Sequence, residues 1–126
     1  MALSKSFEAF ATELLAGVGP IRVKRMFGGA AAYLDERIFA LFDDEAIWIK
    51  VDAENEAAFI EAGAPRLSYS AKDGKLMEMA YRRMPEAALD DAEEATRWAR
   101  LGVQAAMRKP VKTARKPAAP KKAVGT

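Results

Sequence analysis

The chain has 126 residues, a length typical of one domain, and 51% of them are hydrophobic, which is ample for a core. It has no Cys and no His, which excludes disulfides, thiol catalysis, Cys/His zinc sites and imidazole acid–base chemistry. No apolar run approaches the roughly 20 residues of a membrane span, and Glu8 and Glu13 interrupt the apolar N-terminal segment. We therefore expect no membrane contact and no signal peptide, and we predict a cytoplasmic protein.

The net charge of +2 is unevenly divided along the chain. Residues 1–108 hold 14 of the 20 basic residues and all 18 acidic ones, which gives them a net charge of −4. Residues 109–126 have no acid, no aromatic residue and three prolines, so they cannot bury enough apolar surface to offset their ordering entropy. We predict a folded domain over 1–108 and a disordered basic tail over 109–126. The cations of this tail are Lys109, Lys112, Arg115, Lys116, Lys121 and Lys122.

The first predicted element is a helix over residues 4–17. Its apolar residues recur at the spacing of one helical face: Phe7, Phe10, Ala11, Leu14, Leu15 and Val18. Ser4 or Ser6 can cap the N-terminus, and Gly17, or Gly19 followed by Pro20, ends the helix.

Three or four strands follow, over residues 21–27, 30–34, 37–42 and 46–51. Their links are too short for crossovers, so the strands pair as antiparallel hairpins. In the fourth strand, Trp48 and Lys50 point to one face while Ile47, Ile49 and Val51 point to the other. The third strand is apolar on both faces, which indicates either that both faces are covered or that one meets a partner chain.

A second helix is predicted over residues 53–62, with Asp52 as its N-cap. Strands over 66–71 and 75–82 then flank the hairpin turn Lys72-Asp73-Gly74. Pro85 opens a helical region that reaches Arg108 and breaks near Asp90-Asp91. The order α-β(3–4)-α-β2-α predicts a two-layer α+β domain, in which helices pack mainly on one face of an antiparallel sheet of five to six strands.

Four outward strand positions form a candidate surface patch: Arg22, Lys24, Trp48 and Lys50. Arg22 and Lys24 share one strand face, and with Lys50 they form either a basic binding face or a solvated outer face of the sheet. Trp48 either stacks on a base or another ligand, or packs under a helix.

Other polar motifs favour structural roles. Gly28-Gly29 lacks the frame of a phosphate-binding loop and indicates a tight turn or bulge. Arg82-Arg83 either extend the patch or pair with Glu78 and the acidic run over 90–94, and we favour pairing. The carboxylate pairs at 43–44 and 90–91 are typical of turns and caps, so we predict no catalytic residue, no metal site and no cofactor. The methionines at 26, 77, 79 and 84 fill the core or line a partner groove.

The tail favours sequence-independent contact with nucleic-acid phosphates, since its Lys and Arg side chains are separated by Ala and Pro without any acid. The alternative is a tail that only keeps the protein soluble.

Several separated motifs resemble the TfoX N-terminal domain family (TfoX/Sxy). They are Arg25-Met26-Phe27-Gly28-Gly29 followed by Tyr33, Phe39-Ala40-Leu41, Trp48-Ile49-Lys50-Val51-Asp52, Phe59 with Gly63, Tyr69, Tyr81 with Pro85, and Trp98. The resemblance covers roughly residues 5–107. One departure is Asp35-Glu36-Arg37, which stands where the family commonly has an Asp-Gly turn.

The resemblance implies a regulator rather than an enzyme. Two-domain members of the family regulate natural competence and are thought to act with transcription machinery, but here a basic tail stands in place of their second domain. We therefore predict a non-enzymatic regulatory adaptor that binds a protein partner, with the tail adding non-specific contact to DNA. The alternative is a purely protein-binding or homodimerising module without a nucleic-acid function.

Overall fold

The computed structural model describes residues 3–26, 28–43, 46–70, 74 and 76–108, and the predicted basic tail lies outside these residues. The described chain starts with helix α1 (Lys5–Leu14) and the short 3-10 helix η1 (Ala16–Val18). Four strands follow, β1 (Arg22–Met26), β2 (Gly29–Leu34), β3 (Arg37–Phe42) and β4 (Ile47–Lys50). The remaining elements are α2 (Glu56–Glu61), β5 (Arg66–Ser70), β6 (Leu76–Arg83), η2 (Glu86–Asp90) and α3 (Ala92–Met107).

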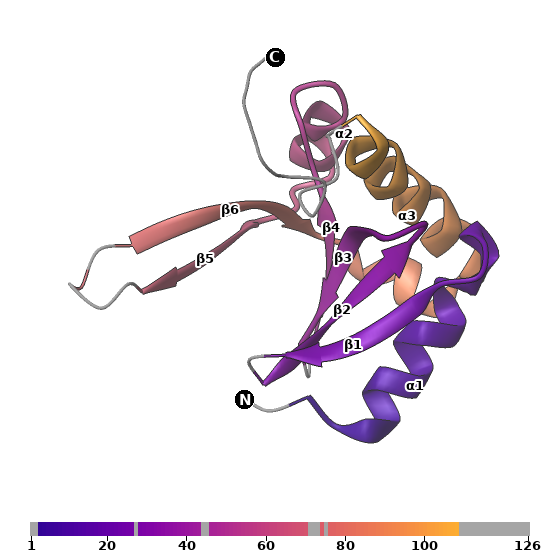
Figure 1. The fold of residues 1–126 in the computed structure, drawn as a ribbon. Helices are drawn as coiled ribbons and strands as arrows, with labels where there is room; N and C mark the ends of the chain where they lie inside the picture. The colour runs from indigo at the N-terminus through magenta and orange to yellow at the C-terminus, as the bar shows by residue number, and fades with distance from the viewer. Residues whose placement is uncertain (1–2, 27, 44–45, 71–73, 75, 109–126) are drawn as a thin grey trace, which may run out of the picture.

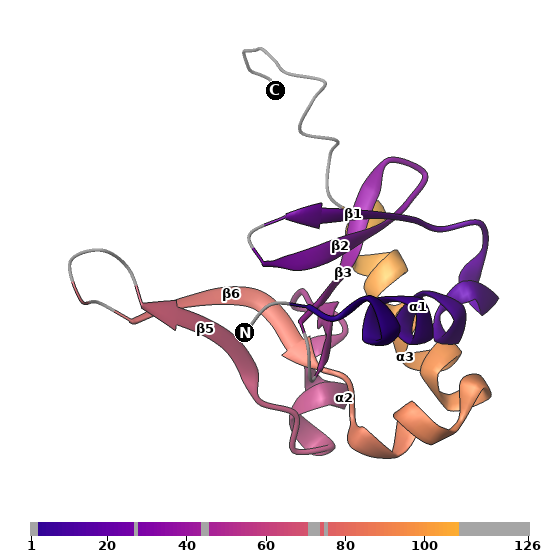
Figure 2. The same cartoon turned by 90° about the horizontal axis from the view of Figure 1, so that it is seen from below.

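The strands of the described residues form one antiparallel sheet of six strands in the order β1-β2-β3-β4-β6-β5. Figures 1 and 2 show the helices gathered on one side of this twisted sheet, while β5 and β6 form a hairpin that projects away from them. The predicted α+β class, the strand number and the packing of helices on one face are therefore confirmed.

The alternation of β4 sets which face of the sheet is buried. Ile47 and Ile49 are fully buried in the hydrophobic core, whereas Trp48 and Lys50 are only half-buried on the opposite face. The core also takes in Ala11 and Leu15 from the α1 region, Phe59 of α2 and Ala99 of α3. All three helices therefore cover the face of Ile49, as the sequence pattern of β4 predicts.

A bulge explains why β3 is apolar at successive positions. Ala32 pairs with Ala40, but the next residue, Tyr33, pairs with Ile38, so Phe39 is an extra residue in its strand. Phe39 and Ala40 are both completely buried in the core. The apolar run of β3 therefore serves mainly the core, and the strand does not present two full apolar faces.

Helix α3 approaches the centre of the sheet most closely at Gly102. A Cβ atom at this position would lie 2.7 Å from Ile49 Cγ2 and 2.7 Å from the backbone oxygen of Phe39. Earlier in α3, the Trp98 ring packs on Phe59 of α2 with 4.7 Å between the ring centroids. Only a residue without a side chain lets α3 contact the backbone of β3 and β4 at this distance.

We predict that Gly102→Ala destabilises the protein. In an exposed helix this change stabilises by about 1 kcal/mol, but here the added methyl group must displace α3 from the sheet, which costs about 1–3 kcal/mol. Urea unfolding measures the difference in the free energy of unfolding. Gln104→Ala, at an exposed position of the same helix, is the control and should change stability little. A Gly102→Ala protein as stable as the original would contradict the close packing.

The turn between β2 and β3 has an unusual backbone for its residues. Asp35 and Glu36 both have positive φ, 53° and 67°, and they connect the paired residues Leu34 and Arg37. A two-residue hairpin turn of this kind normally places Gly at its second position. The chain therefore makes this hairpin with a less suitable residue at position 36.

We expect Glu36→Gly to raise the free energy of unfolding by about 0.5–1 kcal/mol, because glycine adopts positive φ without the steric cost that a side chain brings. Glu36 also forms an exposed ion pair with Arg22 at 3.4 Å, which contributes little. Glu36→Gln removes that charge while keeping a side chain, so it separates the two effects in the same unfolding experiment. A loss of stability in Glu36→Gly beyond that of Glu36→Gln would be incompatible with backbone strain at this turn.

The ends of the first two α-helices differ from the predictions. Ser4 caps α1 as predicted, with its side chain accepting from the Phe7 N–H, but the α-helix ends at Leu14 and a separate 3-10 turn continues to Val18. The second helix begins at Glu56 and not at residue 53. The reason is that the Asp52 carboxylate accepts the N–H groups of Glu54 and Asn55 and holds a turn ahead of the helix. The predicted break near residue 90 is confirmed, since Asp91 caps α3.

Candidate binding face of the sheet

The face of the sheet opposite the helices, called the helix-free face below, carries an ordered row of side chains. Pairing registers place five residues from five adjacent strands in this row: Lys24, Ala31, Leu41, Trp48 and Arg83. Because paired residues point to the same face, the row runs from a cation on β1 to a cation on β6, with Trp48 between them.

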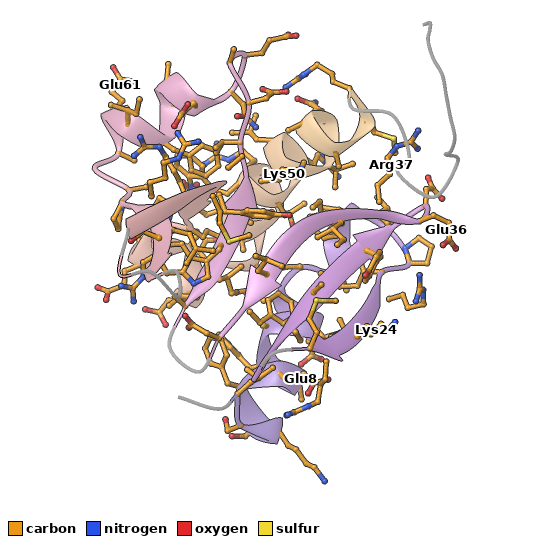
Figure 3. The ribbon with its side chains drawn as sticks, turned by 60° about the vertical axis from the view of Figure 1, so that its left-hand side comes forward. Glu8, Lys24, Glu36, Arg37, Lys50 and Glu61 are labelled. Atoms are coloured by element: carbon orange, nitrogen blue, oxygen red, sulfur yellow. The ribbon has the colours of Figure 1, made fainter. Side chains whose placement is uncertain are left out.

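A second group on the same face combines two tyrosines with two cations. The Arg22 guanidinium lies over the Tyr33 ring at 4.6 Å from its centroid, and the Lys50 ammonium lies 5.1 Å from the centroid of Tyr81. Figure 3 shows Lys24 on β1 and Lys50 on β4, with strands β2 and β3 between them. The four residues of the candidate patch, Arg22, Lys24, Trp48 and Lys50, therefore lie on one face of the sheet.

Trp48 is held in place by the turn that precedes its strand. Its indole N–H donates to the Asp43 carboxylate at 3.1 Å, and the other Asp43 oxygen accepts from the Ala46 N–H at 2.8 Å. The prediction of a turn role for Asp43 is confirmed, while Asp44 lies outside the described residues. The interpretation that Trp48 packs under a helix is wrong. Its side chain lies on the helix-free face, and Trp98 is the tryptophan that packs between helices.

Tyr81 forms the floor of this face rather than an exposed contact point. It is only 7% exposed, and burial, with a smaller effect of the nearby Tyr33, raises the pKa of the Tyr81 hydroxyl to about 12. The hydroxyl therefore stays protonated at neutral pH, when it can donate a hydrogen bond but cannot act as a base.

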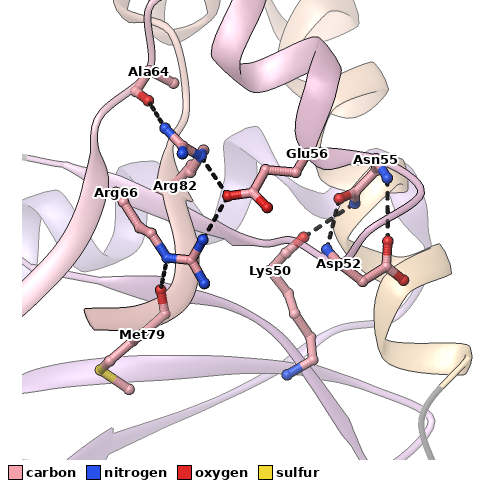
Figure 4. Close-up of polar contacts among 8 residues, drawn as sticks. All are labelled: Lys50, Asp52, Asn55, Glu56, Ala64, Arg66, Met79 and Arg82. Atoms are coloured by element: carbon pink, nitrogen blue, oxygen red, sulfur yellow. Dashed lines mark hydrogen bonds and ion pairs between the residues drawn. The ribbon is translucent and has the colours of Figure 1, made fainter. Parts of the chain in front are cut away.

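Arg82 and Arg83 point to opposite faces of β6. Arg82 Nε donates to Glu56 Oε2 at 2.9 Å, Arg66 Nη1 donates to the same oxygen at 2.6 Å, and Arg82 Nη1 donates to the backbone oxygen of Ala64 (Figure 4). The pairing of Arg82 was predicted with Glu78 or with the acidic run over 90–94, and the structure corrects its partner to Glu56 on α2. Arg83 extends the patch, because it pairs in register with Trp48.

The end of β4 is fixed by a polar cluster on the side of the helices. Asn55, only 6% exposed, donates to the backbone oxygen of Lys50 at 3.3 Å and accepts from the Asp52 N–H (Figure 4). It also donates to the backbone oxygen of Leu101 at 2.8 Å. Asp52 in turn receives two hydrogen bonds from Arg108, at 2.6 and 2.9 Å. This cluster joins β4, α2 and α3, and it places Arg108, the last described residue, beside the strand that carries Lys50.

The Asp52–Arg108 pair should make stability depend on pH. Mainly because Arg108 donates hydrogen bonds to it, the pKa of Asp52 falls from its usual 3.8 to about 2. The folded protein thus binds this proton less tightly than the unfolded chain, so the contribution is present above about pH 4 and is lost as the pH falls toward about 2. We expect Asp52→Asn to be less stable at neutral pH and to lose less stability between these two pH values.

Unfolding by urea at several pH values measures this slope. Arg108→Gln should flatten it in the same way, and Glu61→Gln, which removes an exposed carboxylate of α2 outside the cluster, should leave it as it is. An Asp52→Asn slope as steep as that of the original protein would show that the pair does not govern it.

The remaining candidate motifs have structural roles. Gly28 has a φ of 79° in the turn between β1 and β2, and a Cβ on Gly29 would lie 2.5 Å from the Phe42 oxygen, so the predicted tight turn is confirmed. Of the methionines with described side chains, Met84 is buried in the core and Met79 is 36% exposed, so these two do not share one groove. Among the described residues, no group of acidic side chains is arranged to hold a metal ion, and no helix is long and apolar enough to cross a membrane.

The family model of the TfoX N-terminal domain matches residues 13–106. The chain belongs to the TfoX N-terminal domain family. The match runs from the later part of α1 through all six described strands to the last turn of α3, so it includes both cation–aromatic groups of the helix-free face. A comparison with curated proteins found no match. In this TfoX N-terminal domain, the sequence patterns indicate Arg83 only as the less favoured extension of the patch and do not indicate Tyr33 or Tyr81. All three belong to the face through strand pairing.

Proposed function

We propose that this protein is a non-enzymatic regulatory adaptor of the TfoX type, which binds an anionic partner through the helix-free face while its basic tail adds non-specific contact to nucleic acid. The observation that supports this most directly is the arrangement of that face. Four cations from β1, β4 and β6 lie on one side of the sheet although residues 1–108 carry a net negative charge. These four cations outnumber the two acids that the structure places beside them, Glu36 next to Arg22 and Asp43 next to Trp48.

The structural roles of three acidic side chains, Asp43, Glu56 and Asp91, support an adaptor rather than an enzyme. Asp43 holds a turn and the Trp48 indole, Asp91 caps α3, and Glu56 receives two arginines. Each of these carboxylates is engaged in stabilising local structure.

The charge of the helix-free face argues against a homodimer formed through it. A two-fold interface would bring the same patch of both copies together, so Lys24 and Arg83 would approach cations of the second copy. An anionic partner, in contrast, neutralises these side chains. This favours the adaptor over the self-associating module as the function of this surface.

The tail prediction is tested by the salt dependence of binding to random-sequence duplex DNA. The full chain is compared with a variant in which all six tail cations are changed to Gln. Each phosphate contact contributes a slope of about −0.9 to the plot of log affinity against log salt, so the variant should bind more weakly and with a slope shallower by up to about 5.

A matched control keeps the tail cations and changes Pro110, Pro117 and Pro120 to Ala, which should preserve both affinity and slope. If the chain without tail cations binds duplex DNA as tightly as the original at every salt concentration, the tail has no role in nucleic-acid contact.

A further inference from the structure

We infer that the helix-free face binds single-stranded nucleic acid, with one base stacked on Trp48 and phosphates held by Lys24 and Arg83 on either side. This rests on the proposed function, because it names the anionic partner of the same face. Single-stranded nucleic acid combines regularly spaced negative charge with planar rings that are free to stack, and this face offers a counterpart for both.

The cross-strand row fixes the spacing of these groups. Neighbouring strands lie about 4.8 Å apart, so Trp48 is one strand from Arg83, at about 5 Å, and three strands from Lys24, at about 14 Å along the sheet. The positions between Trp48 and Lys24 are the apolar Leu41 and the fully buried Ala31, neither of which is charged. The Asp43 carboxylate lies at the edge of Trp48, where it accepts from the indole N–H. A strand laid across the row therefore meets cations before and after the tryptophan.

Trp48 is prepared for stacking. It is half-buried, and the 3.1 Å hydrogen bond from its indole N–H to Asp43 fixes one edge of the ring without occupying the ring face. Because the orientation is set before binding, less rotamer freedom is lost when a base stacks on it.

A second platform lies beside the row. The Arg22 guanidinium rests over Tyr33, and a guanidinium plane held in this way can itself stack on a base. Lys24 is exposed and, among the described residues, has no hydrogen-bond or ion-pair partner, so a phosphate can bind it without displacing another group.

Two other anionic partners would use this face differently. Duplex DNA offers phosphates but keeps its bases stacked on each other, so Trp48 would contribute little to its binding. An acidic protein segment would meet the cations and gain little from a flat aromatic ring. A substitution of Trp48 that removes the aromatic ring without changing charge should therefore weaken the binding of single strands, but not that of duplex DNA or an acidic protein segment.

The test measures binding of oligo(dT), oligo(U), a duplex of random sequence and poly-Glu to the full-length chain by fluorescence anisotropy. We expect Trp48→Leu to weaken the binding of both single strands by about five- to 150-fold, since a stacked base contributes about 1–3 kcal/mol. Trp48→Phe should retain most of the affinity. Duplex binding should change little in either variant.

The charge contribution is tested with Lys24→Gln, which should make the salt slope for oligo(dT) shallower by about 0.7. Arg100→Gln is the matched control, because Arg100 is an exposed cation of α3, on the side of the helices. It should leave the slope unchanged.

Folding is followed in the same samples through Trp98, which remains in the Trp48→Leu chain and packs on Phe59. Unchanged oligo(dT) affinity in a folded Trp48→Leu chain would overturn the inference, as would an equal loss for single strands and duplex, or poly-Glu binding that exceeds oligo(dT) binding. If the Trp48 variants bind as the original does while the tail cations still set the salt slope for duplex DNA, only the single-strand site is refuted. If instead the tail cations have no effect on duplex binding, a loss of single-strand binding in Trp48→Leu still supports the site.

Discussion

The contact of α3 with the backbone of β3 and β4 is the constraint on which the rest of the structure depends. Gly102 brings the helix so close that a methyl group would lie 2.7 Å from the Phe39 oxygen. This contact commits Ile49, Ala40 and Phe39 to the core, so their neighbours on β4 must point the other way. Trp48 and Lys50 therefore lie on the helix-free face because α3 packs directly on the residues that alternate with them.

The polar network on the covered side reinforces the same arrangement. Asn55 satisfies backbone groups of both β4 and α3, and a buried amide that makes three hydrogen bonds specifies one position for the elements it joins. Glu56, one residue further along, anchors two arginines of β5 and β6. The segment after β4 thus determines the positions of the outer strands, although the sequence alone indicates only a helix start.

Local patterns were sufficient to predict the elements, because strand alternation and short polar links depend on neighbouring residues. The alternation of β4 correctly separated Trp48 and Lys50 from Ile47 and Ile49. The errors arose where distant residues decide the outcome. The partner of Arg82 follows from the packing of α2 on the sheet. The placement of Arg83 beside Trp48 follows from the pairing of β6 with β4, in which paired residues lie more than thirty positions apart in the chain. The bulge at Phe39 likewise breaks an alternation that the sequence does not interrupt.

The hydrogen bonds between Arg108 and Asp52 have one more consequence. They hold Arg108, the last described residue, against Asp52, which lies two positions after Lys50 of β4. Two weak contacts joined by a short tether act on one ligand at an effective local concentration on the order of millimolar, so their combined avidity exceeds either affinity. Under the proposed function, a nucleic acid bound by the sheet and by the tail would be held at two such contacts on either side of Arg108 in the chain.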